Sequence, residues 1–164
     1  AGYLTEIIDQ LTVEGQPVPE MHALLSEALL GLKAGPATSG FLRTFELRVL
    51  QHLGYDPQLS RCERCARPID DDVTASVDAT HGRVLCDGCE PARSAGLTFS
   101  GAAVRRLDAL RGLSLAEGRQ HGLRGEDGRQ ATELLGRLLL AHLPRGLRST
   151  EVIAALHAGD RHVD

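Results

Sequence analysis

The sequence predicts a mainly α-helical protein: a bundle of about six helices into which a four-cysteine zinc ribbon with a small β-hairpin is inserted. Leucine-rich stripes with helical spacing recur on both sides of the middle of the chain. Between the stripes lie the chain's four cysteines, arranged in two CxxC pairs. We therefore predict a helical domain in two parts, residues 1–60 and 92–164, separated by a zinc ribbon over residues 61–91.

Three helices are expected before the cysteines. The first covers about residues 3–13, where apolar residues follow the i, i+3, i+4, i+7 spacing as far as a Gly- and Pro-rich break. The second begins near Pro19, a residue suited to a first helical turn, and ends at Gly35. The third opens near Thr38 or Ser39, and Gly54 is placed for its C-cap.

Phe41 and Phe45 both fall in the third helix, which makes it the expected centre of the core.

The cysteines form the most informative motif of the chain. Cys62 and Cys65 enclose two residues, and after twenty more residues Cys86 and Cys89 enclose another two. Each CxxC turn, or knuckle, aims two sulfurs at one point, and two knuckles complete a tetrahedron around one Zn²⁺. Four thiolates leave no open position for a water molecule, so the predicted zinc is structural.

Other interpretations of the motif fit the sequence less well. Two disulfides would use the same four residues, but no secretory segment is visible, and reduced thiols in two CxxC pairs fit a metal better. A redox CxxC would need a thioredoxin-like βαβ setting. The alternation over residues 73–77 and 83–85, broken at Thr80-His81-Gly82, predicts the hairpin that delivers the second knuckle. His81 is therefore interpreted as a turn residue and not as a ligand.

The helices after the ribbon are less evenly marked. Ser100 can cap a helix that continues to about Leu110. Residues 112–128 are rich in glycine and charge, which predicts a loop or a short helical turn. A strong helix follows to His142, and a last short one is expected around residues 152–156, ahead of a frayed tail.

Charge is distributed unevenly along the chain. The formal net charge is −4, but residues 1–91 carry seven basic and fourteen acidic side chains, whereas residues 92–164 carry eleven and eight. A polyanion is expected to meet the C-terminal part. No apolar run approaches the ~20 residues of a membrane span. We expect a soluble, cytoplasmic protein, and the start at Ala1 suggests a portion of a longer chain or a processed one.

Motifs of catalysis are missing from the sequence. It has no Gly-rich phosphate loop, GxSxG elbow, HExxH or paired-carboxylate motif. Its acidic cluster, Asp70-Asp71-Asp72, stands at the entry to the hairpin and is interpreted as a solvated turn rather than a Mg²⁺ site. The sequence therefore predicts a protein that is not an enzyme.

Several segments together resemble one family. The stretches Phe45–Leu50 (FELRVL) and Leu53–Leu59 (LGYDPQL) lead directly into the first knuckle. They resemble the C-terminal region of the bacterial RecO recombination mediator. The resemblance continues through the second knuckle to Leu97–Ser100, taken as the opening of the next helix, and ends at Leu143–Ser149 (LPRGLRS).

The resemblance implies a function in recombinational DNA repair without catalysis. RecO-like proteins work with RecR to load RecA recombinase onto single-stranded DNA coated by single-strand-binding protein, and they anneal complementary strands. They pair an N-terminal OB-fold, missing from this sequence, with a helical domain that carries the ribbon. The resemblance implies that single- and double-stranded DNA is held mainly by that OB-fold, in the cytoplasm near the nucleoid.

Two kinds of site follow from the resemblance. Metal binding is assigned to Cys62, Cys65, Cys86 and Cys89. The acidic, phenylalanine-ended tail of single-strand-binding protein should need an apolar notch beside a basic residue that receives its terminal carboxylate. The candidates by charge alone are Arg105, Arg106, Arg137, Arg145 and Arg148. The alternative for these arginines is a solvated helical face.

A second function class remains open, an independent zinc-ribbon module that binds nucleic acid in a transcription or translation factor. It predicts basic residues concentrated on the ribbon. The four arginines there are outnumbered by Glu63, Asp70, Asp71, Asp72, Asp78, Asp87 and Glu90. This charge balance argues against the ribbon as the main DNA contact.

Overall fold

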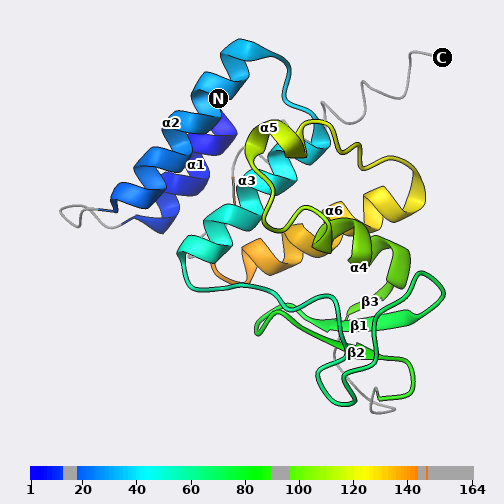
Figure 1. Ribbon diagram of the computed structural model, residues 1–164. Helices are drawn as coiled ribbons and strands as arrows, with labels where there is room; N and C mark the ends of the chain where they lie inside the picture. The colour runs from blue at the N-terminus through cyan, green and yellow to red at the C-terminus, as the bar shows by residue number, and fades with distance from the viewer. Residues whose placement is uncertain (13–17, 90–96, 144–146, 148–164) are drawn as a thin grey trace.

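The computed structural model describes residues 1–12, 18–89, 97–143 and 147. In this part of the chain there are six helices and three strands (Figure 1). In chain order they are α1 (Gly2–Leu11), α2 (Pro19–Ala34), α3 (Ser39–His52), β1 (Thr74–Asp78), β2 (Arg83–Cys86), β3 (Leu97–Ser100), α4 (Gly101–Asp108), α5 (Leu115–Gly118) and α6 (Gly125–Leu140). The predicted fold class, mainly α with a small inserted β element, is confirmed.

Helix α3 lies at the centre of the helical layer. It packs against α2, α5 and α6, while α1 packs on α2 and the sheet lies beyond α4 and α6 (Figure 1). Phe41 and Phe45 on α3 are completely buried. The prediction that this helix forms the centre of the core is therefore confirmed.

Both ends of α3 follow from local sequence. The Thr38 side chain accepts a hydrogen bond from the backbone N–H of Phe41 at 3.2 Å, which caps the first turn. Gly54 has a φ of +83°, and the N–H groups of Gly54 and Tyr55 donate to the carbonyls of Gln51 and Leu50 at 2.9 and 2.8 Å. This is the Schellman arrangement, in which glycine takes the left-handed conformation after the helix.

Polar groups are buried where α1 meets α3. Glu46 is fully buried, forms a 2.8 Å ion pair with Arg43, and accepts a hydrogen bond from the hydroxyl of Tyr3. Burial raises the pKa of Glu46 above the usual range of glutamate, although the Arg43 charge acts in the opposite direction. These contacts tie the first helix to the central one.

Arg119 joins three helices. Its guanidinium donates to the carbonyl oxygens of Gly31 at 2.6 Å and Pro36 at 2.8 Å, at the C-terminal end of α2, and lies 4.7 Å from the centre of the Phe41 ring. Arg119 is the residue directly after α5, a single helical turn whose capping box is formed by Ser114 and Glu117. The predicted loop or short helical turn over 112–128 thus contains a short helix that closes the bundle.

The sheet differs from the predicted hairpin by one strand. Its order is β2-β1-β3, both pairs are antiparallel, and Ala75 lies opposite Cys86 on one side and Phe99 on the other. Residues 97–100 were predicted to open a helix but form β3, because Leu97 and Phe99 alternate with polar residues and Phe99 is buried. Ser100 still caps α4, accepting from the N–H of Ala103.

One further difference concerns the C-terminal half. Helix α6 begins at Gly125, within the stretch predicted as a loop or a short helical turn. Glu126 and Asp127 lie in its first turn, where acidic side chains interact favourably with the positive end of the helix dipole. The predicted last helix around 152–156 lies outside the described residues, as does the predicted ribbon boundary at residue 91, which stays a prediction. Strand β3, beyond that boundary, belongs to the same sheet.

The ribbon and the bundle share one hydrophobic core. Val73, Val77 and Phe99 from the sheet region are buried in the same cluster as Val104 of α4 and Leu134 of α6. Cys62 and Cys86 belong to the same cluster, so the cysteine turns also adjoin this core. Among the described residues, none of the helices is long and apolar enough to cross a membrane.

Candidate metal centre

The first CxxC turn is a closed loop with internal backbone hydrogen bonds. The N–H of Cys62 donates to the carbonyl of Arg67, and the N–H of Ala66 donates to the carbonyl of Cys62, both at 2.8 Å. Ala66 adopts a φ of +59°, the left-handed conformation that L-residues rarely take. The loop turns the chain sharply enough to bring Cys62 and Cys65 to the same side.

The second CxxC turn ends β2. Pairing of β1 with β2 places Cys86 at the last position of the strand, opposite Ala75. The N–H of Cys89 then donates to the carbonyl of Cys86 at 2.9 Å, and the Asp87 carboxylate accepts from the N–H of Gly88. The sheet register therefore sets where the third and fourth cysteines lie.

The four sulfurs converge. All of them lie within 4.8 Å of one another, and Cys65 Sγ is 3.7 Å from Cys86 Sγ. A Zn–S bond of about 2.3 Å gives a tetrahedron whose sulfurs are separated by about 3.8 Å. The four cysteines are free thiols rather than disulfides, so the donor set and its geometry fit a tetrahedral thiolate-bound metal ion.

The cluster also has a particular protonation pattern. Burial opposes ionisation of the Cys62 thiol, but hydrogen bonds from the backbone N–H groups of Cys86, Cys65 and Arg64 outweigh it and lower its pKa to about 6. Burial raises the pKa of Cys86. The pKa of Cys89 is raised to about 12, mainly by a hydrogen bond with Cys65 and to a smaller extent by burial. Metal ligation needs thiolates, so a metal ion would displace the protons that these thiols share.

His81 lies apart from the cluster, as the sequence predicts. It occupies the turn between β1 and β2, its side chain is 61% exposed, and its Nδ1 is 2.6 Å from the Asp78 carboxylate. This interaction, together with two backbone N–H donors, lowers the pKa of Asp78. The pair closes the hairpin turn.

The structure places three of the five candidate arginines, and each of the three has an acidic partner. Arg105 pairs with Asp71 at 3.5 Å. Arg106 lies 4.0 Å from Asp127, and Arg137 pairs with Glu133 at 3.5 Å. Arg145 and Arg148 lie outside the described residues. The acidic partners reduce the net charge that the three described side chains present to a polyanion.

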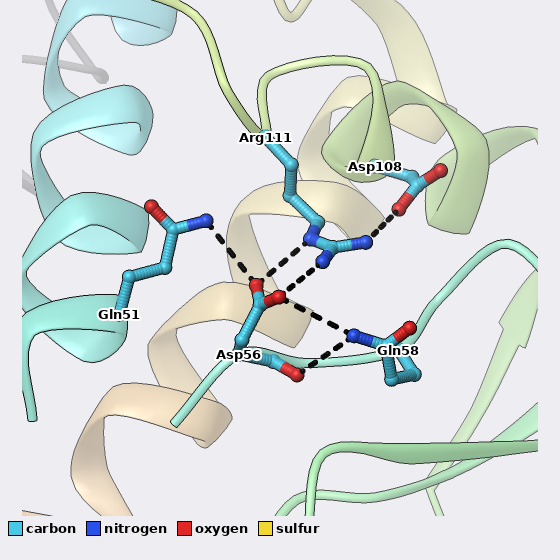
Figure 2. A network of polar contacts seen from close by, with 5 residues as sticks. All are labelled: Gln51, Asp56, Gln58, Asp108 and Arg111. Atoms are coloured by element: carbon cyan, nitrogen blue, oxygen red, sulfur yellow. Dashed lines mark hydrogen bonds and ion pairs between the residues drawn. The ribbon is translucent and has the colours of Figure 1, made fainter. Parts of the chain in front are cut away.

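An interaction network around Asp56 was not predicted. Figure 2 shows the Asp56 carboxylate accepting from Arg111 Nε and Nη2, at 3.1 and 2.5 Å, and from the side-chain amides of Gln51 and Gln58. Arg111 also bonds Asp108 at 3.1 Å. Partial burial opposes ionisation, but these hydrogen bonds, led by that from Arg111, lower the pKa of Asp56.

The network connects the chain before the first knuckle with the turn after α4. The Arg111 side chain is only 21% exposed. The spacing of Asp108 and Arg111 could have indicated their contact. No local pattern indicates Asp56, which is 55 residues away from Arg111.

A shallow hollow lies beside this network. It is bounded by the C-terminal ends of α3 and α6 and by the β1–β2 turn, and its wall includes Leu50, Pro57 and Leu138. The rings of Tyr55 and His142 stack there, with their centroids 3.5 Å apart. Tyr55 is 44% exposed, so an aromatic surface is open to solvent at this position.

Comparison with known proteins gives one consistent result. The family model described as "Recombination protein O C terminal" matches residues 1–151. A "DNA repair protein RecO" of Anaeromyxobacter sp. (strain K) is 35% identical over 147 residues, which are 90% of this chain and 58% of the relative. The protein of the same name from Myxococcus xanthus (strain DK1622) is 31% identical over 155 residues, 94% of this chain and 60% of the relative. The chain thus spans about three fifths of the length of these curated relatives.

Proposed function

The chain belongs to the RecO family, and from this premise we propose that it acts in recombinational DNA repair as a mediator. In this role it helps to load RecA recombinase onto single-stranded DNA coated by single-strand-binding protein, works with RecR, and promotes strand annealing. The observation that carries the proposal is the family match over residues 1–151, together with a cluster of four cysteines folded where the resemblance implies it.

The cysteine cluster is proposed to hold one structural Zn²⁺. Cys62, Cys65, Cys86 and Cys89 would be its ligands, and the 3.7 Å separation of two sulfurs supports tetrahedral thiolate coordination. The ion would hold the two turns together at the β2 edge of the sheet. Metal analysis of the purified chain should find one zinc per molecule, and Cys86→Ser should abolish it because folding of such turns and metal binding are one event.

The helical region is proposed to be a platform without catalytic activity. Four thiolates complete a zinc coordination sphere, so no position is left for an activated water. Asp71 of the acidic turn is paired with Arg105, which supports a surface role for that cluster rather than a metal-dependent nuclease site.

The hollow beside Tyr55 is proposed to receive the acidic, phenylalanine-ended tail of single-strand-binding protein. Leu50 and Leu138 supply an apolar wall, and the exposed Tyr55 ring offers a surface on which a phenylalanine side chain can stack. Asp56 of the same wall is neutralised by its ion pair with Arg111, which also bonds Asp108. The candidates for the carboxylate contact remain Arg105, Arg106, Arg137, Arg145 and Arg148.

Direct DNA contact by this region is proposed to be auxiliary. Three candidate arginines are paired with carboxylates, and the ribbon arginines Arg67 and Arg83 are paired with Asp87 and Glu63. We propose that single- and double-stranded DNA is held mainly by the OB-fold of a longer protein, near the nucleoid.

The test is a pair of fluorescence anisotropy titrations, one with a labelled peptide that ends in the acidic phenylalanine tail and one with labelled single-stranded DNA across a salt series. Saturable peptide binding with weak, salt-sensitive DNA binding supports the platform. Tyr55→Ser should weaken the peptide complex, while Leu30→Ser, which changes another exposed apolar residue on α2, should not. Tight DNA binding without peptide binding would favour the independent zinc-ribbon module.

A further inference from the structure

The two CxxC turns are joined by contacts that involve none of the sulfurs. The backbone N–H of Glu63, inside the first turn, donates to the carbonyl of Val84 at 2.9 Å. The Glu63 carboxylate also forms a 2.7 Å ion pair with Arg83 on β2. Both contacts hold the first turn against the strand that leads into the second.

Arg64 differs from these residues because it reaches a ligand residue. Its Nη1 donates to the carbonyl oxygen of Cys89 at 3.0 Å, across a sequence separation of 25 residues. It thereby connects the interior of the first turn to the final cysteine of the second. This hydrogen bond fixes the backbone of Cys89 directly, whereas the Glu63 contacts act on the strand before it.

Cys89 is the ligand for which such a contact should matter. Cys62 and Cys86 are buried, with 1% and 2% of their surface exposed, so packing holds them in place. Cys65 is exposed, but it lies inside the first turn, which two backbone hydrogen bonds of Cys62 and Ala66 close around it. Cys89 is only half-buried and follows two exposed residues, Asp87 and Gly88. Its own turn contributes a single backbone hydrogen bond to Cys86. A second constraint from outside the turn would restrict the motion that releases this ligand.

Charge points in the same direction. A divalent zinc ion with four thiolates carries a net charge of −2, and a guanidinium held beside the cluster is attracted to it. A hydrogen bond from a charged donor is stronger than one from a neutral donor. Groups that hold metal ligands from outside the coordination sphere commonly change metal affinity by about 10- to 100-fold when they are removed.

We propose that Arg64 is a positioning residue of the metal centre, which holds Cys89 against the first turn and slows the loss of the bound ion. This inference rests on the proposed zinc site and adds a determinant that the CxxC spacing does not contain. The ligand is a divalent cation, and the ion together with its four thiolates carries a net negative charge.

The experiment measures how fast zinc leaves the loaded chain when an excess of a chromogenic chelator is added. Arg64→Ala should release zinc about tenfold faster than the unaltered protein, the lower end of the range for such partners. Arg64→Lys, which keeps the charge and one donor, should fall between the two. Arg61→Ala is the matched control, since Arg61 bonds the Ala66 carbonyl at 3.2 Å within a single turn; its rate should stay within about twofold of the unaltered protein.

A second readout separates positioning from assembly of the site. Co²⁺ in place of zinc should give the same thiolate-to-metal absorption intensity in Arg64→Ala as in the unaltered protein, because all four ligands remain. A weakened band would overturn a role confined to positioning. Equal release rates in Arg64→Ala and Arg61→Ala would overturn the inference while leaving the zinc site standing. Failure of the unaltered protein to bind zinc would overturn the zinc site, and the role of Arg64 with it.

Discussion

Arg119→Ala should reduce the stability of the helical bundle substantially. The guanidinium makes two hydrogen bonds to carbonyl oxygens at the end of α2, those of Gly31 and Pro36, and each is worth about 1 kcal/mol at a partly exposed site. Its contact with the Phe41 ring adds about 0.5–1 kcal/mol. The Gly31 carbonyl is one of the last four of its helix and would lose this partner. We therefore expect the free energy of unfolding to fall by about 2.5 kcal/mol.

The assay is urea unfolding of the metal-loaded chain followed by far-ultraviolet circular dichroism. With a slope of about 2 kcal/mol per molar urea, the midpoint should fall by about 1.2 M. Arg119→Lys keeps a cation and should lose about half as much. Arg129→Ala removes an exposed arginine paired with Glu126 and should change stability by less than about 0.5 kcal/mol. A loss in Arg119→Ala no larger than in this control would refute the reasoning.

Two further changes test other long-range contacts. Gly40→Ala would place a Cβ 2.0 Å from the carbonyl oxygen of His121, so α3 must move away from the chain after α5. We expect the free energy of unfolding, measured by thermal unfolding, to fall by about 3 kcal/mol. Gly136→Ala, whose Cβ meets nothing within 4 Å, should instead stabilise the chain slightly. Asp56→Asn should lower the free energy of unfolding by about 1 kcal/mol at pH 7. The loss should be no larger, because the Asp56 side chain is half-exposed and solvent screens its ion pair with Arg111. Because folding lowers the pKa of Asp56, this difference should be complete well above the ordinary aspartate pKa of about 3.9 and be lost as the pH falls through the lower pKa of the folded state. An equal difference at pH 7 and pH 3 would contradict the assignment.

Much of the fold could be predicted because its signals are local. The caps of α3 depend on Thr38 and Gly54, residues within or next to the turn that they stabilise. Apolar spacing located the helices for the same reason, since one face of each helix must be buried. The prediction for residues 97–100 was wrong because four residues of alternating polarity fit the start of a capped helix as well as a strand, and only pairing with β1 distinguishes them.

The candidate site divides in the same way. The CxxC spacing predicted that the four cysteines come together, because two residues between paired cysteines already restrict both sulfurs to one turn. The acidic partners of Arg105 and Arg106 could not be predicted, since Asp71 and Asp127 lie on other elements. Charge counted along the chain therefore says which residues are basic, but not which of them remain unpaired.

The sequence by itself determined the helical class, the cysteine cluster and the family, because each is encoded in spacing or in short runs of residues. Only the tertiary structure decided which distant groups meet. Arg119 contacts Gly31 across 88 residues, Arg111 contacts Asp56 across 55, and Arg64 contacts Cys89 across 25. Such contacts depend on the angles and distances at which helices and turns pack, and these are set by the shape of the whole core rather than by any local pattern.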